Sequence, residues 1–125
     1  MNDHKSERAV MVVEDETLVR MFIADLLDEF GFSTVLAAAN TRQAIEIAEA
    51  SPPVAAVIDV TLGGEHDGIW LGEQLSARFG TKIIIMSGYD DIADDERIES
   101  LSPEAILHKP CQPDLLKKAI EDATS

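Results

Sequence analysis

The chain has 125 residues and a formal net charge of −14, because 24 acidic side chains oppose 10 Lys and Arg. This length suits one domain with a core of its own, and the strong negative charge disfavours direct binding to the phosphate backbone of nucleic acids. A single cysteine excludes an internal disulfide, and no apolar run approaches the roughly 20 residues of a membrane span. We therefore expect a cytoplasmic protein that binds neither nucleic acid nor a membrane directly.

Apolar segments of strand length recur along the chain and alternate with segments of helical periodicity. Several of them lack the alternation of half-exposed strands, which is typical of a parallel sheet covered by helices on both faces. The polar residues 1–7 are expected to form a disordered tail before the first strand. We predict strands at residues 9–13, 34–37, 54–58, 82–86 and 105–107.

The first two intervening segments have the spacing and the cap residues of helices. Gly31 ends the first helix. Asn40 is a typical N-cap for the second, with Gln43 three residues later, and Pro52–Pro53 ends that helix. The apolar face predicted for the first helix consists of Leu18, Phe22, Ile23, Leu26 and Phe30.

The third and last helices are well marked, whereas the fourth is weak. The third ends at Gly80, and the last follows Pro113. Residues 87–103 hold few large apolar residues and a cluster of acids at 90–96, which is consistent with a solvated helix face or with a loosely packed surface for a partner. The order of elements predicts an α/β fold, a (βα)5 doubly wound three-layer sandwich with a five-stranded parallel sheet, in one domain.

The carboxyl ends of four predicted strands carry residues that are able to do chemistry, at the edge where open α/β sheets form their sites. Glu14-Asp15-Glu16 follow the first strand, Asp59 the third, Ser87 the fourth and Lys109 the fifth. Carboxylates from neighbouring strands would repel one another and need a cation. Their oxygens match Mg²⁺ better than a transition metal, since no His or Cys stands beside them. The acidic run alone could also complement the dipole of the next helix, and its joint occurrence with the other residues favours a metal site.

These motifs, in this order and at this spacing, resemble the receiver domain of bacterial two-component response regulators. The resemblance covers residues 8–123 and implies a flavodoxin-like sheet of strand order 2-1-3-4-5. It also implies a phosphoacceptor rather than an enzyme, and no effector domain follows it in this chain. The motifs are Val13-Glu14-Asp15-Glu16, Ile58-Asp59-Val60, Met86-Ser87-Gly88-Tyr89 and Lys109-Pro110.

The resemblance implies roles for the acidic residues. Asp59 would be the phosphoacceptor, which attacks the phosphohistidine of a sensor histidine kinase to give an acyl phosphate. Asp15, Asp59 and the backbone carbonyl of Thr61 would bind Mg²⁺, with Mn²⁺ as a possible substitute, while Glu14 would act through a bound water. The ion would neutralise the carboxylates and the developing phosphoryl charge.

The resemblance also implies roles for the lysine and the serine. Lys109 would pair with Asp59 and afterwards with a phosphoryl oxygen, and its bond to Pro110 would be cis. Ser87 would donate its hydroxyl to another phosphoryl oxygen and so draw in the loop after the fourth strand. Output would pass by protein contact, or by onward transfer to a histidine phosphotransfer protein, from a monomer or a weak homodimer.

Several positions depart from the family pattern. Ile106 stands three residues before Lys109, where the family's switch commonly has an aromatic residue, so an aromatic rotamer switch cannot operate there. Tyr89 either takes over part of this work or is a loop aromatic beside the site. The loop 61–68 contains the pair Gly63-Gly64 and one extra residue in place of the usual proline, which predicts greater mobility. Thr61 occupies a position that tunes dephosphorylation.

Three other functions stay open on the sequence. A flavodoxin would need a phosphate loop after the first strand, where residues 14–16 would repel the phosphate of FMN. A phosphatase of the haloacid dehalogenase type usually has its nucleophilic Asp after the first strand and a second Asp two residues later, whereas Thr61 follows Asp59 here at that spacing. A pseudo-receiver would bind a partner without phosphorylation, and the complete set of Asp15, Asp59, Ser87 and Lys109 argues against it.

Overall fold

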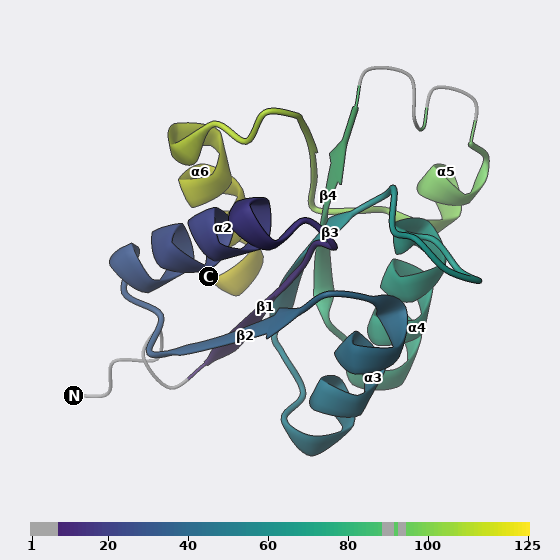
Figure 1. The fold of residues 1–125 in the computed structure, drawn as a ribbon, viewed down its shortest axis with the longest axis horizontal. Coiled ribbons are helices and arrows are strands. Elements are labelled where there is room, and N and C mark those ends of the chain that lie inside the picture. The colour runs from purple at the N-terminus through teal and green to yellow at the C-terminus, as the bar shows by residue number, and fades with distance from the viewer. Residues whose placement is uncertain (1–7, 89–91, 93–94) are drawn as a thin grey trace.

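The computed structural model describes residues 8–88, 92 and 95–125. All five strands are parallel and are ordered β2-β1-β3-β4-β5 across the sheet (Figure 1), which confirms the predicted flavodoxin-like arrangement. Each predicted strand agrees with the observed one to within one residue at either end. The strands are β1 (Ala9–Val13), β2 (Thr34–Ala38), β3 (Ala55–Asp59), β4 (Lys82–Ser87) and β5 (Ala105–His108).

Helices cover both faces of the sheet. In Figure 1, α2 and α6 lie on one side of the sheet and α3 and α4 on the other, with α5 beside α4. Within the described residues, no helix has the length and apolar character needed to cross a membrane. The helices are α2 (Thr17–Glu29), α3 (Thr41–Ala50), α4 (Gly68–Phe79), α5 (Arg97–Leu101) and α6 (Pro113–Thr124).

The sheet separates two apolar cores. Successive side chains of a strand point to opposite faces, so Val10 and Val12 of β1 pack with α2 and α6, while Met11 and Val13 pack with α3 and α4. All four side chains are fully buried. A strand buried on both faces therefore appears in the sequence as an unbroken apolar run, which is why the central strands were predictable.

The predicted apolar face of the first helix is wrong at two positions. Leu18 is 78% exposed and Phe22 is 48% exposed, whereas Ile23, Leu26 and Leu27 are buried. Leu18 and Phe22 are four residues apart and form an apolar stripe of their own, next to the stripe that faces the sheet. Periodicity alone could not decide which of the two stripes is buried.

The predicted caps are confirmed. The Asn40 side chain accepts a hydrogen bond from the Gln43 N–H at 2.8 Å, and the Gln43 side chain accepts one from the Ala39 N–H at 2.8 Å. Gly31, with φ of 106°, ends α2 in a Schellman motif, in which the Phe32 N–H bonds to the Leu27 carbonyl. The weak helix predicted within residues 87–103 is observed as the five-residue α5, which buries none of its residues.

Candidate functional site

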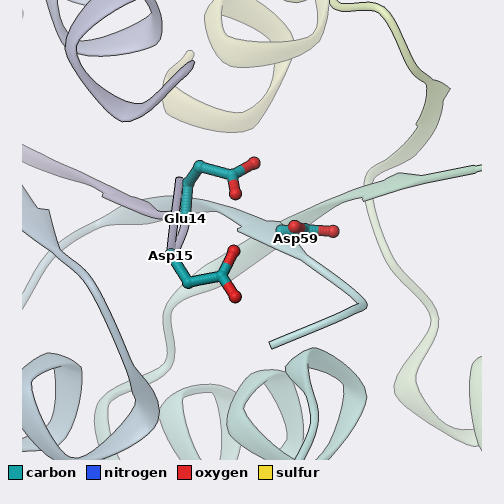
Figure 2. A group of neighbouring side chains, drawn as sticks. All are labelled: Glu14, Asp15 and Asp59. Carbon is teal, nitrogen blue, oxygen red and sulfur yellow. The ribbon is translucent and has the colours of Figure 1, made fainter. Parts of the chain in front are cut away.

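Three carboxyl groups meet at the carboxyl ends of β1 and β3, as Figure 2 shows for Glu14, Asp15 and Asp59. Each offers an oxygen within 4.8 Å of the others. They converge because β1 and β3 are neighbours in register, with Val13 opposite Ile58. Glu14 and Asp59 are each only 2% exposed, whereas Asp15 is exposed. The sequence therefore predicted this convergence correctly.

Both carboxylate oxygens of Asp59 have a partner. Oδ2 lies 2.9 Å from Lys109 Nζ, and Oδ1 accepts a hydrogen bond from the Thr61 N–H at 3.0 Å. Lys109 is placed by β5, since its backbone N–H donates to the Ser87 carbonyl at 2.9 Å, and its bond to Pro110 is cis. The ammonium group of Lys109 compensates the charge of the buried Asp59 carboxylate. The same ammonium group would also stabilise negative charge added to a carboxylate oxygen of Asp59.

Glu14 has one oxygen without a partner. Its Oε2 accepts a hydrogen bond from the Glu16 N–H at 3.0 Å, and its buried Oε1 has no hydrogen-bond partner among the described residues. Burial, reinforced by the nearby charge of Asp59, raises the pKa of Glu14 to about 7. An orphaned carboxyl oxygen within an all-oxygen acidic cluster fits a hard cation such as Mg²⁺, which would compensate this charge.

Ser87 lies at the end of β4 beside the acidic cluster. It follows Met86, which is opposite Asp59 in the register of β3 and β4. Ser87 is fully buried, and its hydroxyl has no hydrogen-bond partner among the described residues. A buried hydroxyl without a partner costs folding free energy. Because the Ser87 hydroxyl has no partner among the described residues, it is available as a donor to a group that enters the site.

Two contacts that the sequence did not reveal hold the backbone around the site. Gly68 packs so closely on the strand end that an added Cβ would lie 2.1 Å from the carbonyl oxygen of Asp59. Arg20 on α2 donates from Nη1 to the Glu14 carbonyl at 2.8 Å. An Asp-Gly pair before an apolar helix signals an N-cap, and Asp67 does cap α4 by accepting the Trp70 N–H. That signal identifies the cap but not the close approach to Asp59.

The other predicted site residues lie outside this cluster. Ile106 is exposed on the edge strand β5, and Pro110 lines a groove next to Lys109. Thr61 is exposed, and its backbone N–H contacts Asp59. Tyr89 lies outside the described residues, so its suggested part in a switch stays a prediction.

Comparison with known proteins identifies the family. The family model for the response regulator receiver domain matches residues 10–121. Over 118 residues the chain is 31% identical to the transcriptional regulatory protein PdtaR of Mycobacterium tuberculosis and 33% identical to a putative NtrX-like response regulator of Rickettsia bellii. These matches span 94% and 90% of this chain, but 57% and 24% of the two relatives. The chain belongs to the response regulator receiver family of two-component signalling.

Solved structures agree with this assignment. The signal receiver domain of a modulated diguanylate cyclase from Desulfovibrio desulfuricans G20 superimposes with a TM-score of 0.85 at 27% identity, over 94% of this chain and 93% of that one. A CheY-like receiver domain protein from Methanospirillum hungatei JF-1 gives a TM-score of 0.80 at 25% identity, over 93% of each chain. The fold and the family therefore agree.

Proposed function

We propose that this chain is the Mg²⁺-dependent phosphoacceptor of a phosphorelay, in which Asp59 takes a phosphoryl group from the phosphohistidine of a sensor histidine kinase. A carboxylate oxygen of Asp59 attacks phosphorus, the P–O bond forms, and the P–N bond breaks as the imidazole leaves with its electron pair. The observation that carries the proposal is the setting of Asp59, a buried carboxylate paired with Lys109 at 2.9 Å and flanked by Glu14 and Asp15.

The chain's own residues supply the charges that such a transfer needs. Asp15, Asp59 and the backbone carbonyl of Thr61 would hold Mg²⁺, or Mn²⁺ in its place, and Glu14 would act through a water. When bound, the ion supplies positive charge that offsets the carboxylates and the phosphoryl oxygens. Lys109 Nζ would move its ion pair from Asp59 to a phosphoryl oxygen.

Ser87 distinguishes this proposal from a pseudo-receiver. Its buried hydroxyl has no partner in the described residues and would donate to a phosphoryl oxygen on Asp59, which gives the modified protein a hydrogen bond that the unmodified protein lacks. A binding module that is never phosphorylated has no evident use for this donor. The same hydrogen bond would connect the chemistry at Asp59 to the backbone after β4.

The surface beside the site supports a protein as the donor. A groove of about 430 Å³ runs from Glu14 and Lys109 to Phe22 and Cys111. Phe22 of this groove is one of several large apolar side chains that are exposed on α2 and at the start of α6. Such exposed apolar surface next to a polar site is typical of protein interfaces, and a kinase or a histidine phosphotransfer protein is the partner we propose, in the cytoplasm. These exposed side chains are Leu18, Met21, Phe22 and Leu115.

The test is phosphorylation by a small donor. Acetyl phosphate or phosphoramidate with Mg²⁺ should add one phosphoryl group to the protein by intact mass, and chelation of the ion should prevent it. Asp59→Asn should abolish the adduct, whereas Asp122→Asn, on the exposed face of α6, should not change it. An unmodified wild-type protein, or an undiminished adduct in Asp59→Asn, would refute the proposal. A time course of transfer from purified sensor kinases then tests the natural donor.

A further inference from the structure

Arg97, the first residue of α5, joins two acidic side chains. Its Nη1 and Nη2 donate to the two carboxylate oxygens of Asp67 at 3.1 Å and 2.7 Å. Its Nε and Nη2 donate to the two oxygens of Asp95 at 3.0 Å and 2.7 Å. We call this group of Asp67, Asp95 and Arg97 the Arg97 clasp. A doubly bidentate arginine of this kind has an exacting geometry, so it is either formed or broken.

One end of the clasp reaches the acceptor site. Asp67 is the N-cap of α4 and accepts the Trp70 N–H at 2.9 Å. The next residue, Gly68, donates its N–H to the Val60 carbonyl at 2.9 Å and packs directly on the backbone of Asp59. Any displacement of Asp67 is therefore transmitted to the backbone at the acceptor.

The other end of the clasp holds a weakly attached helix. α5 has five residues and none of them is buried, although Ile98 and Leu101 pack partly against the core beneath α4. Because a helix of this length is not stable alone, its position depends on such contacts. Within the described part of the chain, α5 is also the first helix after Ser87, the residue whose hydroxyl would turn toward a phosphoryl group.

We propose that the Arg97 clasp holds α5 in its position in the unphosphorylated protein and opens when Asp59 carries a phosphoryl group. This inference rests on the proposed function of Asp59. The side chains of Arg97 and Asp67 are 41% and 35% exposed, so the pair is partly screened by water. The clasp therefore biases the position of α5 without locking it, and a new hydrogen bond from Ser87 to a phosphoryl oxygen would compete with a contact of similar modest strength.

Two substitutions remove the clasp in different ways. Arg97→Gln removes the guanidinium. Asp67→Asn removes the charge that pairs with Arg97 but keeps an oxygen for the Trp70 N–H, since Asn is also a good N-cap. Arg78→Gln is the matched control, because it breaks an ion pair of 2.7 Å and similar exposure between α4 and Glu49 of α3, at the far end of α4.

The first readout is the affinity for beryllofluoride in the presence of Mg²⁺, since this anion binds an aspartate as a phosphoryl mimic. Calorimetry gives the affinity, and the fluorescence of Trp70, whose ring stacks on His66 at 3.8 Å, gives a second measure. If the clasp opposes the phosphorylated state, Arg97→Gln and Asp67→Asn bind about two- to five-fold more tightly than the wild type, as expected for a partly exposed ion pair. Unchanged or weaker binding in both, with Arg78→Gln equal to the wild type, overturns the proposal.

The second readout separates failure of the clasp from failure of the proposed function. Hydrogen exchange of the metal-free protein should be faster at α5 in Asp67→Asn, although the substitution lies in another loop, and unchanged there in Arg78→Gln. If the wild type binds no beryllofluoride, the phosphoacceptor proposal fails, and exchange alone then decides on the clasp. Equal protection of the α5 amides from exchange in Asp67→Asn and in the wild type overturns the proposal of the Arg97 clasp.

Discussion

Gly68→Ala should destabilise the protein although alanine is the better helix former. The added Cβ would lie 2.1 Å from the carbonyl oxygen and 2.8 Å from the carbonyl carbon of Asp59, and 2.9 Å from the Cα of Val60. All three atoms belong to the backbone of a fully buried strand and its continuation, so no side chain can turn away to make room. The N-terminus of α4 must therefore move away from the sheet.

The size of the effect follows from three contributions. Overpacking costs about 1–3 kcal/mol, and the displaced Gly68 N–H loses its bond to the Val60 carbonyl, which costs about 1 kcal/mol. Replacing glycine by alanine within a helix returns about 0.4–1 kcal/mol. The expected net loss is about 2 kcal/mol, which corresponds to a fall in Tm of about 8 °C for a chain of this size.

Urea and thermal unfolding measure this loss, and Gly63→Ala is the control. Gly63 lies in the same loop, and an added Cβ there would meet only Asp15 Oδ2 at an ordinary 3.9 Å. If Gly68→Ala and Gly63→Ala had the same stability, α4 would be free to shift away from Asp59, and the close approach would not constrain the acceptor. Phosphorylation by acetyl phosphate should slow in Gly68→Ala and stay near the wild-type rate in Gly63→Ala.

Three further predictions concern stability. Asn40→Ala should cost about 1 kcal/mol in urea unfolding by loss of the N-cap, whereas Asn40→Asp should be nearly neutral. Leu27→Ala, in the core, should cost about 2–5 kcal/mol of unfolding free energy, and Leu18→Ala should lie within about 0.5 kcal/mol of the wild type. Equal losses in the two variants would mean that Leu18 is buried, as the sequence predicted. Because the pKa of Glu14 is raised to about 7, the folded state holds the Glu14 proton more tightly than the unfolded state does, and the contribution of Glu14 to stability falls as the pH rises from about 4.5 through 7. In EDTA, Glu14→Gln should therefore be more stable than the wild type by about 2–3 kcal/mol at pH 8 and nearly equal to it at pH 4; a difference that did not change with pH would contradict this.

The sequence was sufficient for the sheet and for the convergence of the acidic residues. Buried parallel strands are apolar runs, and their carboxyl ends share one edge, so the positions of Glu14, Asp15 and Asp59 followed from the strand pattern. The sequence was not sufficient for contacts between residues that are far apart in the chain and meet only in the folded structure. Arg97 and Asp67 are 30 residues apart, and neither local spacing nor residue type shows that they meet.

The buried face of α2 is a second feature that the sequence did not determine, because it depends on how the helix packs on the sheet. Leu18 and Phe22 have the spacing of a core stripe, and only the position of α2 on the sheet decides that these two are exposed, whereas Ile23, which was predicted, and Leu27, which was not, are buried. Apolar residues at helical spacing therefore predicted that a helix forms but not how it is rotated. The error is informative, because apolar side chains left on the surface beside a site indicate a place for a partner.

The division of the core by the sheet has a consequence for how such a domain diversifies. One core joins the sheet to α2 and α6, and the other joins it to α3 and α4, and among the residues that the structure describes no side chain belongs to both. Substitutions more than about 7–10 Å apart with no shared partners add independently in stability. The surface over α2 and α6 and the surface over α4 and α5 can therefore accumulate changes separately, so that, under the proposed function, a donor and a target that bound these two surfaces would be selected independently around one unchanged strand edge.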